Sequence, residues 1–143
     1  MKNLMTRSFA MLAFLFVSVT QAQSISFAED PQMTVPKLQN ITGYKITYTA
    51  KKPGTIYLEI RKDGKAIGNG IYEVTKAGTN TVPMNIWIWE GPGQLSRGCT
   101  YSYTLSMWED PKNVFNTKAA DAPEIKNVCV GKPKKKKKKK KNK

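Results

Sequence analysis

Short runs of alternating apolar and polar residues limit most strongly how this chain can fold. Residues 99–108 place Tyr101, Tyr103, Leu105 and Met107 on one face of an extended chain and polar residues with Trp108 on the other. An alternation of period two is typical of a β-strand with one buried side and one solvent-facing side. Residues 44–50, 55–61, 66–74, 79–90 and 125–130 carry further strand-like runs, and no helical period of any length follows the N-terminal segment.

Turn residues separate these runs. Asp63-Gly64 lies between two of them and predicts a hairpin turn. Gly68 and Gly70 indicate a bulge or bend in the returning strand, and Pro83 indicates that the next strand is broken or lies at an edge. About six or seven short strands of this kind predict an all-β fold, either an antiparallel sandwich or a barrel.

The N-terminal segment predicts export from the cell. Lys2 and Arg7 form a basic start, residues 8–19 are apolar, and residues 20–22 offer a small-x-small cleavage site before Gln23. The alternative is a membrane anchor, but a helix that spans a bilayer needs roughly twenty apolar residues and this run is shorter. We therefore expect a secreted product, extracellular or periplasmic, with no transmembrane segment in the mature chain.

Composition divides the chain into a signal peptide (1–22), a loosely structured lead-in (23–37) with space for a short edge strand at 33–35, one β-domain (38–131) and a tail (132–143). The formal net charge is +14, and ten lysines lie in the tail: Lys132, Lys134, Lys135, Lys136, Lys137, Lys138, Lys139, Lys140, Lys141 and Lys143. Two further basic residues belong to the signal peptide, so the body carries a net charge of only +2. Like charges repel and bury nothing, and the tail should therefore be disordered.

The two cysteines, Cys99 and Cys129, both follow the predicted signal peptide. In an oxidising compartment, an even pair in a small domain usually forms a disulfide bond. The alternative is two buried free thiols. A zinc site is disfavoured because the chain has no histidine and two thiolates rarely complete such a site, so neither a metal nor another cofactor is predicted.

Residues 95–105 resemble a motif of known β-sandwiches. Leu95, Gly98 and Tyr101 match the Leu-x-x-Gly-x-x-Tyr approach to the penultimate strand of immunoglobulin-like and fibronectin-III-like domains, where a tyrosine corner pins the chain. The resemblance covers roughly residues 41–130 and implies a single antiparallel β-sandwich of about seven strands, with Tyr101 or Tyr103 as the corner tyrosine.

The chain departs from antibody domains in where its cysteines fall. The resemblance places a Cys99–Cys129 bridge between the last two strands rather than between the two sheets. The chain therefore looks like the exported bacterial accessory domains that accompany secreted carbohydrate-active enzymes, adhesins or surface proteins. That resemblance implies binding or spacing.

Catalysis is not expected. Without histidine, the chain cannot use Ser-His or Cys-His mechanisms. A carboxylate pair remains formally possible among Glu90, Glu109 and Asp110, but these residues belong to sequences that are typical of turns after strands. We therefore predict that the protein is not an enzyme.

Aromatic residues supply the candidate binding site of the body. A period of two puts Trp87 and Trp89 on one face of a strand, with their Cα atoms about 7 Å apart, and flat rings spaced like this can stack on successive sugars. Tyr57 and Trp108 also fall opposite the aliphatic faces of their strands, so that four aromatics can share an outer surface. The alternative is that Trp87 and Trp89 belong to the core, as large aromatics usually do.

The lysine tail predicts adhesion to anionic partners without readout of sequence. Hydrated point charges on a flexible chain condense on acidic polysaccharide, extracellular nucleic acid or anionic lipid. A nuclear-localisation signal conflicts with the signal peptide, and a lysine expansion without function remains an alternative.

Together these features predict a secreted, non-catalytic module. We expect its sandwich to contact glycan through surface aromatics while its tail adheres to anionic polymers or surfaces. The alternative is a structural or protein-interaction domain that its basic tail anchors electrostatically.

Overall fold

The computed structural model describes residues 22–109 and 117–131, and the tail and nearly all of the predicted signal peptide lie outside this part. These residues form nine β-strands and one short 3-10 helix, η1 (Pro92–Gln94). The strands are β1 (Ser24–Phe27), β2 (Thr34–Val35), β3 (Asn40–Ala50), β4 (Gly54–Lys62), β5 (Lys65–Val74), β6 (Gly78–Ile88), β7 (Gly98–Trp108), β8 (Lys118–Asp121) and β9 (Ile125–Val130). The all-β prediction is confirmed.

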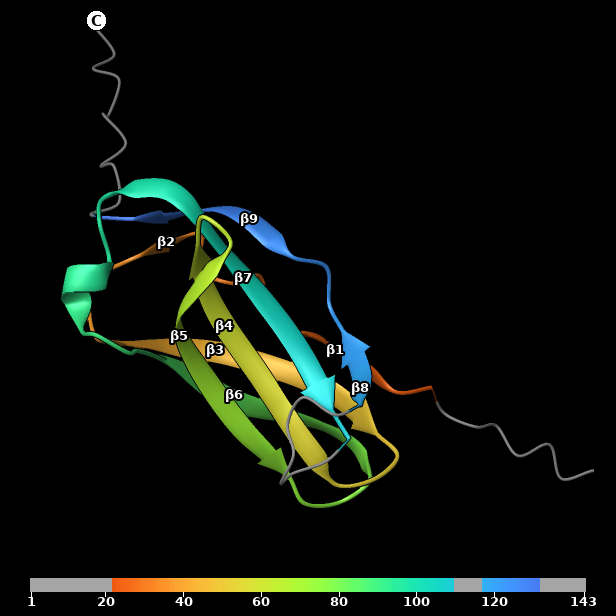
Figure 1. The fold of residues 1–143 in the computed structure, drawn as a ribbon. Helices are drawn as coiled ribbons and strands as arrows, with labels where there is room; N and C mark the ends of the chain where they lie inside the picture. The colour runs from red at the N-terminus through yellow and green to blue at the C-terminus, as the bar shows by residue number, and fades with distance from the viewer. Residues whose placement is uncertain (1–21, 110–116, 132–143) are drawn as a thin grey trace, which may run out of the picture.

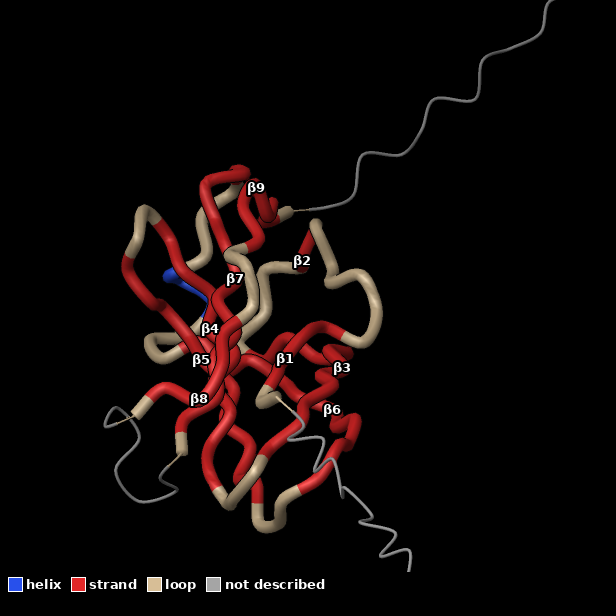
Figure 2. Tube along the Cα trace, turned by 90° about the vertical axis from the view of Figure 1, so that its right-hand side faces the viewer, coloured by secondary structure: helices blue, strands red, loops and turns tan. Residues whose placement is uncertain are grey.

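All nine strands belong to one sheet that curls over itself (Figure 1). Its order is β1-β3-β6-β5-β4-β7-β9-β2, with β8 paired to the end of β7. Every pairing is antiparallel except the short parallel contact between β2 and β9. From the side, β3 and β6 lie on one flank of the molecule, and β4 and β5 lie on the other (Figure 2).

Strands β5 and β6 meet at a short junction, and glycine makes this junction possible. Only two residue pairs join the strands, Gly68 with Ile88 and Asn69 with Trp87. A Cβ atom on Gly70 would lie 2.0 Å from the backbone oxygen of Asn85, and one on Gly68 would lie 2.6 Å from that of Trp87. The predicted bend at these two glycines is therefore a close approach of backbones, which no larger residue permits.

The core fills the inside of the curl. The apolar faces of β3 and β6 turn toward those of β4 and β7, as the alternation predicts. The most deeply buried side chains include Ile46, Ile86, Leu58, Leu105 and Tyr103. Two tyrosines span this interior, because the Tyr44 hydroxyl of β3 donates to that of Tyr103 on β7 at 3.0 Å.

The hairpin prediction is confirmed, whereas the expectation that Pro83 lies in an edge or broken strand is wrong, because β6 is a continuous strand between β3 and β5 in the sheet. Asp63 and Gly64 connect β4 to β5 with positive φ angles of 49° and 80°, which is the left-handed geometry that tight hairpin turns need. Pro83 lies within β6, where it pairs only with Lys45 of β3. The other side of β6 is unpaired at that level, so the missing N–H of proline costs no ladder hydrogen bond there.

Two other expectations also need correction. The lead-in at residues 23–37 is more ordered than expected, because β1 pairs with β3 and Ile25 is buried in the core. Strand β2, at the edge of the sheet, agrees with the short edge strand expected at 33–35. The polar segment before Pro123 contains β8, which pairs with the end of β7. Strands β1 and β8 were not expected from the sequence, because β1 alternates over only four residues and β8 does not alternate. Among the described residues no helix is long and apolar enough to cross a membrane.

Candidate functional site

Trp87 lies on the solvent-facing side at the end of β6, and Trp89 lies in the turn directly after the strand. Trp87 and Trp89 are 52% and 53% exposed. Ile86, which precedes Trp87, and Ile88, which lies between the two tryptophans, are buried. The interpretation that these tryptophans belong to the core is therefore wrong. These two exposed indole rings, two positions apart in the chain, form what we call the tryptophan pair.

Neighbouring strands hold the tryptophan pair in place. The Trp89 indole N–H donates to Oδ1 of Asn69 at 3.2 Å, and the Trp89 backbone N–H donates to the Ile67 carbonyl at 3.1 Å. On the other side, the Ile88 N–H donates to the Gln39 carbonyl at 2.8 Å. The backbone carrying both rings is thus fixed from two sides, which favours a preformed surface.

An open groove of about 710 Å³ lies elsewhere on the outer surface, above β4, β7 and β8. Its lining includes two of the predicted aromatics, Tyr57 and Trp108, but neither Trp87 nor Trp89. Tyr57 retains 8% exposure and Trp108 is half-buried, so both rings serve as walls rather than as open platforms. The four predicted aromatics therefore divide between two places.

Polar side chains surround the aromatic walls of the groove. Thr104 donates its hydroxyl to Oε2 of Glu59 at 3.0 Å, and the Trp108 indole N–H donates to Oγ of Ser106 at 3.0 Å. The ammonium of Lys118 lies 5.7 Å from the centroid of the Trp108 ring. Rings flanked by hydroxyl, carboxylate and ammonium groups can bind small polar ligands such as sugars.

The charged residues of the groove are paired with one another or with a neighbour. Arg61 Nε lies 3.6 Å from Oε2 of Glu59, and Lys118 Nζ lies 3.1 Å from Oδ2 of Asp121. The Glu124 carboxylate lies 3.8 Å from Lys126, at the rim. Burial, together with the nearby Glu59 carboxylate, raises the pKa of the Tyr57 phenol, so Tyr57 remains a neutral hydrogen-bonding group. The groove consequently has little net charge.

Sequence reasoning found the aromatics of the groove but missed its polar residues. Period two places Glu59 and Arg61 on the same face of the strand at 55–61 as Tyr57, but neither was selected as a site residue. Lys118 and Asp121 had no such signal, because β8 itself was not predicted.

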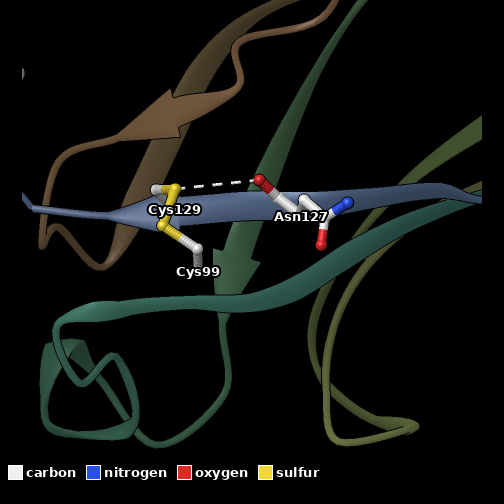
Figure 3. The surroundings of a disulfide bond; sticks show 3 residues. All are labelled: Cys99, Asn127 and Cys129. Carbon is white, nitrogen blue, oxygen red and sulfur yellow. Dashed lines mark hydrogen bonds between the residues drawn. A yellow bond between two sulfur atoms is a disulfide. The ribbon is translucent and has the colours of Figure 1, made fainter.

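The predicted disulfide is present and joins Cys99 of β7 to Cys129 of β9, across 30 residues of chain (Figure 3). The bridge is placed where Gly98 and Tyr101 change register against β9. The Cys129 sulfur also lies 3.7 Å from the Asn127 carbonyl. The covalent link holds together a strand pair whose hydrogen-bond ladder is interrupted.

Tyr101 ties the loop before β7 to the core. Its ring is buried, its hydroxyl donates to the Ser96 carbonyl at 2.9 Å, and it accepts the Ser96 N–H at 2.8 Å. Tyr103 differs, since its hydroxyl donates to the Gln32 carbonyl at 2.7 Å, 71 residues away. Of the two tyrosines considered for a corner role, Tyr101 makes the local backbone contacts.

The carboxylates considered for catalysis do not meet in the described part of the chain. Glu109 lies 2.7 Å from the Lys52 ammonium and accepts a hydrogen bond from Gln23 at 3.0 Å. Glu90 interacts with Gln94 at the turn around η1, and Asp110 lies outside the described residues. Within residues 22–109 and 117–131, no three His, Cys, Asp or Glu side chains are grouped to hold a metal ion.

Comparisons with protein-family models and with curated proteins find no match to this chain. The function is therefore inferred from the sequence and from the geometry of the tryptophan pair and the groove.

Proposed function

We propose that the chain is a secreted, non-catalytic binding module that contacts a glycan through its outer aromatic residues. The exposure of the tryptophan pair carries this proposal. Burying an indole ring is strongly favourable. Trp87 and Trp89 nevertheless remain about half exposed, at positions separated by the buried Ile88. Exposed rings on a rigid strand provide apolar contact area at little cost in conformational entropy when a ligand binds.

The fold that we propose for the module is an immunoglobulin-like β-sandwich, in which the two flanks of the curled sheet act as its layers. The Tyr101 contacts with Ser96 support a tyrosine corner. The bridge between β7 and β9 supports a distant relative of antibody domains rather than a member of them. An experimental structure in which the flanks do not face each other would exclude this architecture.

Export is supported by the signal-like residues 1–22 and by the disulfide, which is more stable in oxidising compartments. N-terminal sequencing of the mature protein tests this part of the proposal. A chain that begins at Gln23 supports cleavage of a signal peptide, whereas an intact N-terminus inside the cell excludes it.

Glycan-array binding with and without the tryptophan pair tests the main proposal. The matched variants are Trp87→Ala/Trp89→Ala and Met33→Ala, since Met33 is also exposed but lies before β2. We expect the double variant to lose binding while Met33→Ala retains it, with both proteins folded by circular dichroism. Absence of binding by the intact protein to any neutral or acidic glycan would refute the proposal.

The lysine tail supports a separate contact with anionic polymers or surfaces. Cutting the chain before Lys132 removes ten positive charges and keeps every described residue, including Gly131, whose N–H donates to the Val35 carbonyl. Retention on heparin or DNA at low salt should then be lost, because such retention depends on lysine contacts with polyanions. Unchanged retention would mean that the tail does not bind these polymers.

A protein partner is the second candidate, and the exposed apolar side chains favour it. Leu38, Ile71 and the tryptophan pair are all more than half exposed, and contiguous apolar surface often marks a protein interface. Size-exclusion chromatography with light scattering should then show self-association or a complex. A strictly monomeric protein without a partner would exclude this candidate.

A further inference from the structure

The tryptophan pair and the groove lie on the same face of the sheet, although no residue belongs to both. Trp87 of β6 is opposite Asn69 of β5, and Asn69 is opposite Glu59 of β4. Residues directly opposite each other point to the same side of a sheet, as do residues two apart on one strand. Tyr57 therefore faces outward on the same side as Trp87.

Ile71 fills the interval between the two places. It lies on β5 directly opposite Tyr57, and its side chain is 59% exposed. Trp108 of β7 is opposite Thr55, two residues from Tyr57, and continues the series on the far side. From each residue of this series to the one on the next strand, the position along the strands changes by two residues or not at all. All of these changes have the same direction. The result is a diagonal row, which we call the aromatic stripe: Trp89, Trp87, Ile71, Tyr57 and Trp108.

Strand geometry gives the length of this stripe. It crosses three strand spacings of about 4.8 Å and about six residues of strand length at about 3.3 Å each, which makes its path roughly 25 Å long over the curved surface. A pyranose ring is similar in width to a single aromatic side chain. The stripe is thus long enough for several consecutive sugars.

The polar neighbours of the stripe indicate a ligand without net charge. Asn69 orients Trp89, and the Thr104 hydroxyl holds Glu59. The charges along the groove neutralise one another in the pairs Glu59–Arg61, Lys118–Asp121 and Glu124–Lys126. A charged polymer would have to break these pairs, whereas sugar hydroxyls can both donate to the carboxylates and accept from the cations.

We propose that the aromatic stripe is one continuous track for a linear, neutral polysaccharide, bound along its length rather than at its end. This inference rests on the proposed glycan-binding function and specifies its ligand class. The tryptophan pair stacks on one part of the chain, Ile71 contacts the middle, and the groove takes the next sugars against Tyr57 and Trp108. A polymer held in this way contacts both places at once, so removal of either weakens binding of a long chain.

Competition by oligosaccharides of increasing length tests the track. The intact protein is first mixed with insoluble cellulose, chitin, mannan and xylan, and calorimetry then uses fragments of two to six sugars from the polymer that retains it. We expect the affinity to rise at least tenfold from the disaccharide to the hexasaccharide. Equal affinity for all lengths would overturn the track.

Three variants locate the contacts. Trp87→Ala, Ile71→Asp and Trp108→Ala should each weaken hexasaccharide binding about tenfold or more, while Met33→Asp should not. Ile71 and Met33 are both exposed, so this pair compares the same charge on and off the stripe without a change in the core. Trp108 is half-buried, so Trp108→Ala could unfold the protein. In that case Ile71→Asp, a change at an exposed position, decides whether the stripe binds the ligand.

The outcomes separate this inference from the proposed function. If the intact protein binds a polysaccharide but Ile71→Asp binds it equally well, the stripe is refuted and the tryptophan pair alone remains as the site. If none of the four polymers is retained, the stripe is refuted. If no array glycan binds either, the glycan-binding function fails with it, and association through the same face becomes the alternative.

Discussion

Tyr44 and Tyr103 meet inside the core with their hydroxyl oxygens 3.0 Å apart and their ring planes at 73°. Tyr44 donates to Tyr103, which in turn donates to the Gln32 carbonyl at 2.7 Å. This relay connects β3, β7 and the segment before β2. Two phenols without solvent around them need such partners, because an unsatisfied buried hydroxyl would cost about 1 to 3 kcal/mol.

The relay predicts a loss of stability in alkaline solution. Burial raises the pKa of Tyr103 to about 12, and burial with the neighbouring Tyr103 raises the pKa of Tyr44 further above its usual value. The contribution of these neutral phenols is complete below about pH 10 and is lost as the pH rises through the raised pKa values. Absorbance at 295 nm should show two tyrosines ionising last, together with unfolding, and Tyr44→Phe or Tyr103→Phe should each remove one of them. Ionisation of every tyrosine in one phase near pH 10 by a folded protein would contradict this.

Glu109 predicts a second pH dependence, in acid. Hydrogen bonds from Lys52 and Gln23 lower the pKa of its carboxyl below the usual value of 4.5. The charged carboxylate therefore stabilises the fold above pH 4.5, and this contribution disappears as the pH falls through the lowered pKa. Melting temperatures measured from neutral to acid pH should converge between wild type and Glu109→Gln at the acid end. Curves that stay parallel would show that this contact does not matter for stability.

Removal of the disulfide should destabilise the protein without changing its fold. Cys99→Ser/Cys129→Ser opens a loop of 30 residues, which the chain-entropy model values at about 3 to 4 kcal/mol in the free energy of unfolding. Urea denaturation measures this difference. As a control, a reducing agent should lower the stability of wild type but leave that of the double variant unchanged.

The crossing of β5 and β6 predicts a sharp contrast between two glycines. Gly70→Ala would place a methyl group 2.0 Å from the Asn85 oxygen, whereas no atom lies within 4 Å of a Cβ at Gly93. We expect a loss of at least about 2 kcal/mol for Gly70→Ala and a change within about 0.5 kcal/mol for Gly93→Ala. Equal stability of the two variants would mean that the strands can separate at this junction.

Local alternation predicted the six principal strands, because each of them has one buried and one outer face that the sequence shows directly. The last strand, expected at residues 125–130, has those bounds in β9. The strands that were missed are short. Lys118–Asp121 has no alternation, and Ser24–Phe27 alternates over only four residues and pairs with β3 residues that are 19 to 25 positions away.

The candidate site was only partly predictable for the same reason. The period-two alternation identified outward positions for Trp87 and Tyr57. It could not show which of these positions other residues cover, and Tyr57 is covered while Trp87 is exposed. That depends on the sheet order, which places β5 between β6 and β4. Ile71 was not selected as a ligand contact, since a single isoleucine gives no signal until its register opposite Tyr57 is known.

Strand β7 connects the end of the described chain with the groove. Its first residue, Gly98, pairs with Val130, and the Gly131 N–H donates to the Val35 carbonyl, so the described chain ends beside the start of β7 (Figure 1). Trp108, the last residue of β7, lines the groove. Eleven residues of strand separate the two ends by about 33 Å. A polysaccharide in the groove and a polyanion held by the lysines after Gly131 would thus attach at opposite poles. If both proposed contacts form, one molecule could crosslink two different materials, and each attachment could form or break while the other persists.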